Sequence, residues 1–386
     1  MDKEKIRNLI GETFNDIADA LVTGQFSSKI KIGLTTLGSE HKVETLVKSA
    51  ERASKTGNFE VVLIGPKCET DLELYEVTCE NDAQQKMEEL LDSNYLHGCV
   101  TMHYSFPIGV STVGRIITPA YGKEMLIATT TGSSDTDRTI SMFKNAVYGI
   151  ITAKALGIVN PTVGILNVDN ARSVERLLKK LNGNGYEINF GESIRSDGGT
   201  VMRGNDLITG SCDIMVTDTL TGNILMKLFS SFNTGGSYEA LGYGYGPGIG
   251  FDQKRIISII SRASGIPVIV NALNYTAQLA QGDIHNIIAL ESHKLQKAKF
   301  FDLIEEHKAA NVSKDVSAND YKRPEKEVVS SEIVGIDILE LEAAVETLLR
   351  NGIYAESGMG CTGPIILVSE KNISKAKTIL HENSYC

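Results

Sequence analysis

The sequence predicts an α/β fold built mainly from parallel strands, with helices packed on both faces of the sheets. Short apolar runs, such as FEVVLIG at 59–65 and TVGILNV at 162–168, alternate with longer stretches of helical periodicity. Glycine, serine, threonine or proline follows most of these runs, and this succession of strand, turn and helix is typical of parallel sheets. The length of 386 residues is enough for two or three domains.

The first half of the chain follows this pattern from its beginning. Residues 4–22 place apolar side chains on one helical face, with acids and amides opposite. Apolar side chains alternate at 30–34, which indicates a strand, and the run at 59–65 is typical of a buried strand because Pro66 closes it. The elements expected up to residue 161 are strands at 30–34, 59–65, 98–103 and 125–131, and helices at 4–22, 40–56 and 139–156.

The alternation begins again after Pro161, as though a second α/β unit started there. Strands are expected at 162–168, 187–190, 213–217 and 267–271, and helices at 171–182, 219–232, 252–263 and 283–309. The polar stretch 311–332 then indicates a linker. It is followed by an expected strand at 333–338, a helix at 339–350, a glycine-rich loop at 358–364, a strand at 365–369 and a helix at 373–382.

These elements predict two α/β domains and a smaller third unit. The first domain is expected at 1–150, with the helix around 283–310 packing back onto it, and the second at 151–282. A linker at 311–332 leads to a C-terminal α/β unit at 333–386, which carries a cysteine in its glycine-rich loop. Ligands of open parallel sheets bind beyond the carboxyl ends of the strands, so function is expected in the loops that follow them.

Composition narrows the classes of function. There are 38 Lys and Arg against 48 Asp and Glu, a net charge of −10, which argues against nucleic acid as a partner. The charged first thirty residues and the short apolar runs predict neither a secretory signal nor a membrane span. Six widely spaced cysteines fit free thiols in a reducing cytoplasm. Without CxxC or HExxH, no metal ion and no bound cofactor are expected.

The segment ESGMGCTGP at 356–364 is the first candidate for chemistry, because Cys361 lies among glycines just ahead of a strand. Glycine lets a substrate approach main-chain amides, and Gly360, Thr362 and Gly363 could supply such amides to an oxyanion. A thiolate is nucleophilic, and nearby N–H dipoles lower the pKa of a thiol. The alternative interpretation, a tight turn with an incidental cysteine, is equally compatible with the sequence.

Two further segments have the composition of anion sites. TTTGSSDTDR at 129–138 follows a strand and opens a helix, so Ser133, Ser134 and Arg138 could hold phosphate. The alternative is an ordinary helix cap at Thr136 or Asp137. The same two interpretations apply to DIMVTDTLTGNILMK at 213–227: an anion site or a capped helix. The side chains of interest in that segment are Thr219, Thr221, Asn223 and Lys227.

Two other features carry weaker signals. Residues 235–250 are rich in glycine and tyrosine but match neither GxGxxG nor a Walker loop, which favours a flexible lip over a cleft or a structural crossover. Cys99 lies in an apolar strand, where a buried and unreactive thiol is the ordinary expectation.

TVGILNV and VTDTLTGNILMK resemble the phosphate acetyltransferase and PlsX-type acyltransferase superfamily, and the TGN-x-x-x-K pattern is the best single mark. The similarity covers about residues 95–300. With ESGMGCTGP and the C-terminal unit added, the chain resembles more closely the family of alpha subunits of component C of clostridial glycine, sarcosine and betaine reductase complexes. The resemblance implies a two-domain, PlsX-like fold with a reactive cysteine near the C-terminus.

The resemblance also implies a function. In that family, selenoprotein A delivers a two-carbon unit as a carboxymethyl selenoether, component C takes it up as an acetyl thioester, and inorganic phosphate, the co-substrate, releases acetyl phosphate. Cys361 matches the acyl-carrying cysteine, and Cys99 matches a second family cysteine of less settled role. The expected stable partner is a beta subunit similar to thiolase-type condensing enzymes, in a hetero-oligomer.

Two departures from the wider superfamily bear on the acyl donor. Phosphate acetyltransferases place a Ser–Arg pair after the strand that we match to 267–270, where this chain has Asn271 and Ala272. PlsX-type enzymes follow a corresponding strand with an acidic pair and Lys-Gly, where this chain reads DNAR at 169–172. Both departures argue against coenzyme A or acyl carrier protein as the donor, and they are compatible with an acyl donor that arrives on a protein-bound cysteine. A stand-alone phosphate acyltransferase and a non-catalytic scaffold remain the alternatives.

Overall fold

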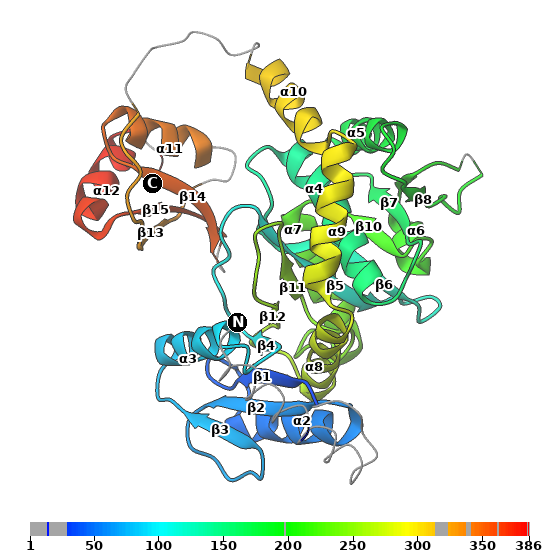
Figure 1. Cartoon of the computed structure of the whole chain (residues 1–386), viewed down its shortest axis with the longest axis vertical. Helices are drawn as coiled ribbons and strands as arrows, with labels where there is room; N and C mark the ends of the chain where they lie inside the picture. Colours follow the sequence, from blue (N-terminus) through cyan, green and yellow to red (C-terminus); the bar gives the residue numbers. More distant parts are fainter. Residues whose placement is uncertain are drawn as a thin grey trace.

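The computed structural model describes residues 14, 29–196, 198–312, 323–336, 341–360, 363–383 and 385. The helix expected at 4–22 therefore lies outside the described residues, except for residue 14. So do Cys361 and Thr362. The described chain forms one large mixed sheet covered by helices, with a separate C-terminal unit beside it (Figure 1).

The large sheet consists of two parallel halves joined through antiparallel strands. Within the described residues it has 12 strands, with β9 pairing onto β7 off the main path. Strand pairs are parallel from β3 to β12 and again from β6 to β8, whereas β12–β11, β11–β5 and β5–β6 are antiparallel. The order across the sheet is β3 (Glu73–Glu76), β2 (Glu60–Gly65), β1 (Lys31–Thr35), β4 (Gly98–Thr101), β12 (Ile257–Ile259), β11 (Gly246–Ile249), β5 (Val110–Ile117), β6 (Glu124–Ser133), β10 (Ile214–Val216), β7 (Thr162–Leu166) and β8 (Asn189–Phe190), with β9 at Val201–Met202.

Helices cover both faces of this sheet, as expected for an α/β fold. Beside the first half, α2 and α8 share one apolar core, whereas α3 packs on the opposite face. Beside the second half, α4 lies buried between the sheet and helices α5 and α9, while α7 packs on the other face against β5 and β6. The helices are α2 (Val43–Thr56), α3 (Glu80–Asp92), α4 (Arg138–Ala155), α5 (Ala171–Gly183), α6 (Gly204–Thr209), α7 (Thr219–Ser231), α8 (Ile266–Gln281), α9 (Ile284–Lys297) and α10 (Phe300–Val312).

Two of the predicted elements are wrong. Residues 267–271 belong to helix α8, not to a strand, and the segment 252–263 contains strand β12 rather than a helix. Pro267 stands in the first turn of α8, where its missing N–H costs no hydrogen bond. The helix is apolar on several sides because it packs on the sheet and on α2, and a short all-apolar run does not distinguish strand from helix.

Two other expectations are corrected in part. The helix expected at 283–309 is two helices, α9 and α10, separated at Lys299, which has a φ of 60°. The glycine- and tyrosine-rich stretch at 235–250 includes the buried strand β11 between β12 and β5, so the crossover interpretation holds for that part.

The C-terminal unit has a sheet and an apolar core of its own. Its strands pair antiparallel in the order β13–β15–β14, and Ile333, Leu348, Ile366 and Leu380 are among the residues of its core. The segment expected as a glycine-rich loop at 358–364 lies mostly in β14 and β15. The elements are β13 (Ser331–Val334), α11 (Leu341–Arg350), β14 (Ala355–Gly360), β15 (Gly363–Val368) and α12 (Ile373–Glu382).

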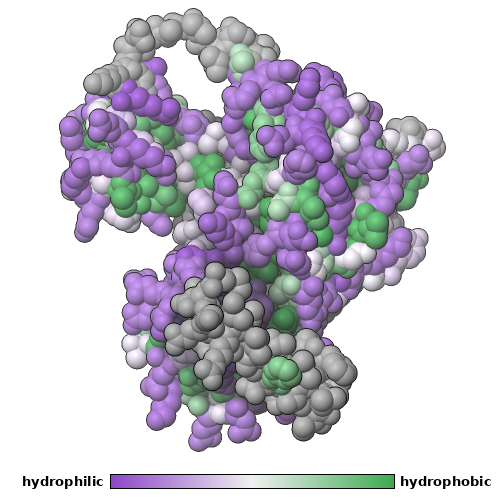
Figure 2. All heavy atoms as spheres, in the orientation of Figure 1, coloured by the Kyte–Doolittle hydropathy of each residue, from purple (hydrophilic) through white to green (hydrophobic). Residues whose placement is uncertain are grey.

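This unit contacts the body through strand β14. Gly358 forms a bridge with Pro107, and β14 lies against β6. Figure 1 shows the unit in orange and red beside the large sheet. The face seen in Figure 2 is mostly hydrophilic, with hydrophobic residues in small separate patches. Among the described helices, none is both long enough and apolar enough to cross a membrane.

Candidate functional site

A cleft of about 860 Å³ lies where the carboxyl ends of several strands meet the C-terminal unit. The body contributes residues that follow β4 and β12, the last part of β6, and the first turns of α7. The C-terminal unit contributes Ile336, Met359, Gly360 and Pro364. This position agrees with the expectation that ligands bind beyond the carboxyl ends of parallel strands. The body residues that line the cleft are Glu40, Met102, Tyr104, Phe106, Thr131, Gly132, Thr219, Leu220, Asn223, Lys227, Tyr245, Ile259, Ile260, Ser261 and Arg262.

The start of α7 is held against β6 by main-chain contact. Asp218 caps the helix, because its carboxylate accepts hydrogen bonds from Thr221 N at 3.1 Å and Thr221 Oγ1 at 2.6 Å. Gly222 lies so close to β6 that a Cβ there would be 1.7 Å from the carbonyl oxygen of Thr129. Only glycine permits this approach, which explains the glycine of the TGN-x-x-x-K pattern.

Asn223 and Lys227, both predicted as site residues, line the cleft one helical turn apart. Asn223 Nδ2 donates to the carbonyl oxygen of Thr130 at 3.2 Å, which fixes the amide at the end of β6. Lys227 Nζ lies 5.7 Å from the centroid of the Tyr245 ring. No ion pair joins this ammonium group to a carboxylate within the part of the chain that the structure describes, so its charge faces the cleft.

Ser261 and Arg262 lie on another wall of the cleft, just after strand β12. The sequence-based prediction placed a strand at 267–271. The family's Ser–Arg pair was therefore expected ten residues further along the chain, at Asn271 and Ala272. That assignment is wrong, since Asn271 and Ala272 lie inside helix α8. The pair that follows a strand is Ser261–Arg262, and Arg262 Nη2 lies 3.6 Å from Glu80 Oε2.

Four other predicted phosphate-site residues do not line the cleft. Ser133 Oγ donates to the carbonyl oxygen of Asp135 at 2.7 Å, and Thr221 Oγ1 donates to the carboxylate of Asp218, which caps α7. Ser134 is fully buried and donates to Asn145 Oδ1 at 2.7 Å. The 41% exposed side chain of Arg138 pairs with Asp218 at 3.2 Å and Asp169 at 3.5 Å. At this loop the helix-cap interpretation is confirmed, because Asp137 accepts a hydrogen bond from Ile140 N at 2.9 Å.

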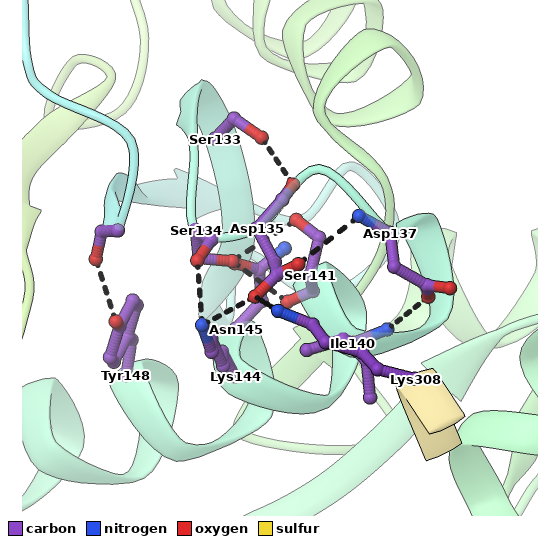
Figure 3. A network of polar contacts seen from close by, with 11 residues as sticks. Ser133, Ser134, Asp135, Asp137, Ile140, Ser141, Lys144, Asn145, Tyr148 and Lys308 are labelled. Carbon is purple, nitrogen blue, oxygen red and sulfur yellow. Dashed lines mark hydrogen bonds and ion pairs between the residues drawn. The ribbon is translucent and has the colours of Figure 1, made fainter. Parts of the chain in front are cut away.

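The segment 129–138 instead anchors a buried polar network at the start of α4 (Figure 3). The 5% exposed carboxylate of Asp135 lies 2.6 Å from Lys144 Nζ and 3.0 Å from Lys308 Nζ. Burial alone would raise the pKa of Asp135, but hydrogen bonds and charge from the two lysines hold it below its ordinary value. Lys308 belongs to α10, so this network fastens α10 to the loop that precedes α4.

The two described neighbours of the Cys361–Thr362 segment form a strand pair. Gly360 of β14 pairs with Gly363 of β15, and Met359, Gly360 and Pro364 line the cleft. Cys361, the predicted acyl carrier, and Thr362 lie outside the described residues. The chain therefore enters and leaves this segment at the wall of the cleft.

Cys99 is fully buried in strand β4, between β1 and β12. Burial raises the pKa of its thiol well above the usual range for cysteine. The sulfur of Cys99 also fills the space beside Gly33. A Cβ atom added to Gly33 would lie 2.7 Å from Cys99 Sγ. Cys99 does not line the cleft, in keeping with the ordinary expectation of a buried thiol. In the described part of the chain, no group of three or more His, Cys, Asp or Glu side chains could hold a metal ion.

Comparisons with known proteins place this fold and cleft in a family. A family model described as fatty acid synthesis protein matches residues 30–367. The chain is 59% identical over 378 residues, 98% of each chain, to the glycine/sarcosine/betaine reductase complex component C subunit alpha of Peptoclostridium acidaminophilum. It is 25% identical over 238 residues to the phosphate acyltransferase of Thermotoga petrophila, covering 52% of this chain and 68% of that protein.

The phosphate acyltransferase of Thermotoga maritima is similar to the same degree, with 26% identity over 235 residues, 51% of this chain and 68% of the relative. The similarity to the reductase subunit extends along nearly the whole chain, whereas the phosphate acyltransferases match about half of it. The chain therefore belongs to the fatty acid synthesis protein family, the PlsX-like family of the sequence-based expectation, and it is similar over nearly its whole length to a component C alpha subunit.

Proposed function

We propose that this chain is the alpha subunit of component C of a glycine, sarcosine or betaine reductase complex, and that it transfers an acetyl group from Cys361 to inorganic phosphate. The main support for the proposal is that the body and the C-terminal unit line the same cleft. The body presents Lys227, Asn223 and the Ser261–Arg262 pair to the cleft, and the C-terminal unit presents the strand pair that flanks Cys361. No bound cofactor is required, because phosphate is the co-substrate.

The chemistry of these body residues suits a phosphate dianion. Lys227 and Arg262 supply positive charge, and Asn223 and Ser261 supply polar groups at the cleft surface. The amino end of α7 opens at the same place, and a helix amino terminus favours an anion. Phosphate attacks a thioester slowly in water, so holding both reactants in one cleft is where the protein can contribute most.

The proposed transfer moves the acetyl group from the cysteine sulfur to a phosphate oxygen. A phosphate oxygen attacks the thioester carbonyl carbon, a C–O bond forms, and the C–S bond breaks as the sulfur leaves with its electron pair. The proton of hydrogen phosphate passes to the thiolate, so the products are acetyl phosphate and the free thiol. Amides beside the developing oxyanion would lower the barrier, and Gly360, Thr362 and Gly363 are the proposed source of those amides.

The proposed acyl donor and partners follow from the relative. It is described as a subunit of a reductase complex component, which supports a hetero-oligomer for this chain. We propose that selenoprotein A delivers the two-carbon unit as a carboxymethyl selenoether. The C–Se bond breaks as a second thiol of the donor protein bonds to the selenium, which leaves the selenium oxidised in a Se–S bond and reduces the carbon to a methyl group. The Cys361 sulfur bonds to the carboxyl carbon, and the displaced carboxyl oxygen leaves as water. A beta subunit similar to condensing enzymes is the proposed stable partner.

The test runs the transfer in reverse. The full chain, purified with the subunits that accompany it, is incubated with isotopically labelled acetyl phosphate, and acetylated peptides are mapped by mass spectrometry. We expect the label on Cys361, released again when inorganic phosphate is added. Cys361→Ala should abolish the label. Cys99→Ala and Cys68→Ala are the matched controls and should keep it, since neither thiol lines the cleft.

Each alternative predicts a different result. Acyl phosphate formation from acyl-coenzyme A or an acyl carrier protein, undiminished in Cys361→Ala, would indicate a stand-alone phosphate acyltransferase. An absence of label on the wild-type protein, together with alkylation of Cys361 no faster than that of Cys68, would indicate a scaffold. Either outcome contradicts the proposal.

A further inference from the structure

Glu239 is a buried carboxylic acid directly behind the cleft. It lies between α7 and β11 and is 4% exposed. Its main chain is fixed beside the segment that follows β12, because Glu239 N donates to the carbonyl oxygen of Ala263 at 3.0 Å and Gly265 N donates to the carbonyl oxygen of Glu239 at 2.8 Å. Burying a carboxyl group in this way costs free energy unless neighbouring groups form hydrogen bonds or ion pairs with it.

The Glu239 carboxyl group lies beside two side chains that line the cleft. Tyr245 Oη donates to Oε1 at 3.0 Å, and Ser261, which also lines the cleft, lies near the same carboxyl group. Ser264 Oγ donates to Oε2 at 3.3 Å, but Ser264 is buried and does not reach the cleft. Tyr245 precedes β11 and Ser264 follows β12, so Glu239 fixes the relative position of two separate segments of the cleft wall.

The same carboxyl group acts electrostatically on Lys227. The Lys227 ammonium lies against the ring of Tyr245, and the charges of Lys227 and Glu239 attract each other. The groups that face Glu239 are thus Lys227 from α7, Tyr245 from the segment before β11, and Ser261 and Ser264 from the segment after β12. An ionised Glu239 offsets part of the positive potential of Lys227, whereas a protonated Glu239 leaves that potential for an anion in the cleft.

We propose that Glu239 is a positioning residue of this cleft, which holds Tyr245 in place against the segment that follows β12 and whose ionisation sets how strongly Lys227 attracts an anionic substrate. The identification of that anion as phosphate rests on the proposed function. The positioning role itself rests on the contacts of Glu239, which are independent of Cys361.

The direction of the pH effect follows from the environment of the carboxyl group. Burial raises the pKa of Glu239 above its ordinary value, and the hydrogen bond from Tyr245 and the charge of Lys227 only partly oppose this. As the pH rises through this shifted pKa, Glu239 gains a negative charge and the cleft should bind anions less tightly. Replacement by glutamine, which keeps the shape and a hydrogen-bonding oxygen but not the charge, should remove that loss.

The test measures anion binding with inorganic sulfate, which keeps both negative charges across the pH range. Isothermal titration calorimetry on the full chain at about pH 5 and about pH 8 compares wild type with Glu239→Gln. We expect wild-type affinity to fall with rising pH and the affinity of Glu239→Gln to stay constant. At the higher pH the variant should bind sulfate about fivefold more tightly than wild type. Ser264→Ala removes one hydrogen bond to Glu239 but keeps the carboxyl group, so it should still lose affinity as the pH rises.

A second measurement separates positioning from charge. In the phosphate-dependent release of acetyl from Cys361, Glu239→Ala should lower kcat about tenfold because Tyr245 loses its hydrogen-bond partner. Glu239→Gln should restore kcat and change only the KM for phosphate. A residue with a purely structural role would not separate kcat from KM in this way.

Three results would overturn the proposal: equal pH dependence of sulfate binding in wild type and Glu239→Gln, no sulfate binding to wild type at either pH, or a wild-type kcat in Glu239→Ala. The failure of the proposed function is distinguishable from these. If Cys361 takes up no acetyl but sulfate binding keeps its Glu239-dependent pH profile, the acyl-transfer function is wrong and the role of Glu239 stands.

Discussion

Arg138 Nη2 lies 3.2 Å from Asp218 Oδ2, so the first residue of α4 is tied to the residue that caps α7. Sequence analysis treated Arg138 as a direct phosphate ligand, yet its guanidinium group does not line the cleft. Burial alone would raise the pKa of Asp218, but the hydrogen bonds from Thr221 and the charge of Arg138 hold it below its ordinary value. Arg138 therefore acts on the cleft through the start of α7.

Replacing Arg138 by alanine should slow phosphorolysis and leave the extent of acetyl loading unchanged. The start of α7, which positions Asn223 and Lys227, loses one of the contacts that fix it. A small displacement of a binding group costs about tenfold in rate. The measurement is the rate at which acetylated protein loses its label after phosphate is added. Asp169→Asn is the matched control, since Asp169 is the exposed second partner of Arg138. A variant that cannot be acetylated at all would contradict this account.

Gly222→Ala should displace α7 from β6. The added Cβ would overlap the carbonyl oxygen of Thr129, which belongs to the backbone and cannot rotate away. We expect a lower melting temperature and a raised KM for phosphate, because Asn223 loses its hydrogen bond to Thr130. Gly183→Ala at the end of α5, where nothing lies within 4 Å of the added atom, is the control and should leave both quantities unchanged. Wild-type stability in Gly222→Ala would show that the contact is looser than described.

Asp135→Asn should destabilise the protein by about 3 kcal/mol at neutral pH, because two lysines would then face a neutral amide in a buried site. The pKa of Asp135 is lowered on folding, so its contribution is present at pH values above the ordinary pKa of aspartic acid. As the pH falls through the shifted pKa, wild type loses this contribution, and the two melting temperatures should converge.

Thermal unfolding of wild type and Asp135→Asn from neutral to acidic pH measures this difference. The control is Asp302→Asn, an exposed acid on α10 for which the structure gives no ion pair. It should follow wild type at every pH. A difference between wild type and Asp135→Asn that is independent of pH would indicate that the loss arises from packing rather than charge.

The sequence predicted the order of the elements well where the hydrophobic period was clear. The strands near 59–65 and 162–168 and the helix at 373–382 were found because alternation or a helical stripe set them apart from glycine and proline. The prediction for Ile266–Gln281 was wrong because α8 is buried on more than one side. Its apolar side chains therefore show no helical periodicity. That error also moved the expected Ser–Arg pair ten residues along the chain.

The candidate site was predicted in part for a similar reason. Asn223 and Lys227 were found because their spacing places them one turn apart after a strand. Ser134 and Arg138 have the residue types of a phosphate site, but long-range partners decide their direction: Asn145 for Ser134 and Asp218 for Arg138. Glu239 gave no signal, because its burial depends on residues before β11 and after β12.

The C-terminal unit that walls one side of the cleft has a core of its own, so the hairpin of β14 and β15 can change its sequence without loosening the large sheet. In evolutionary terms, the two sides of the cleft are free to diverge at different speeds. A lineage could adapt the hairpin to another donor protein or a bulkier acyl chain while keeping the side formed by Asn223 and Lys227 intact.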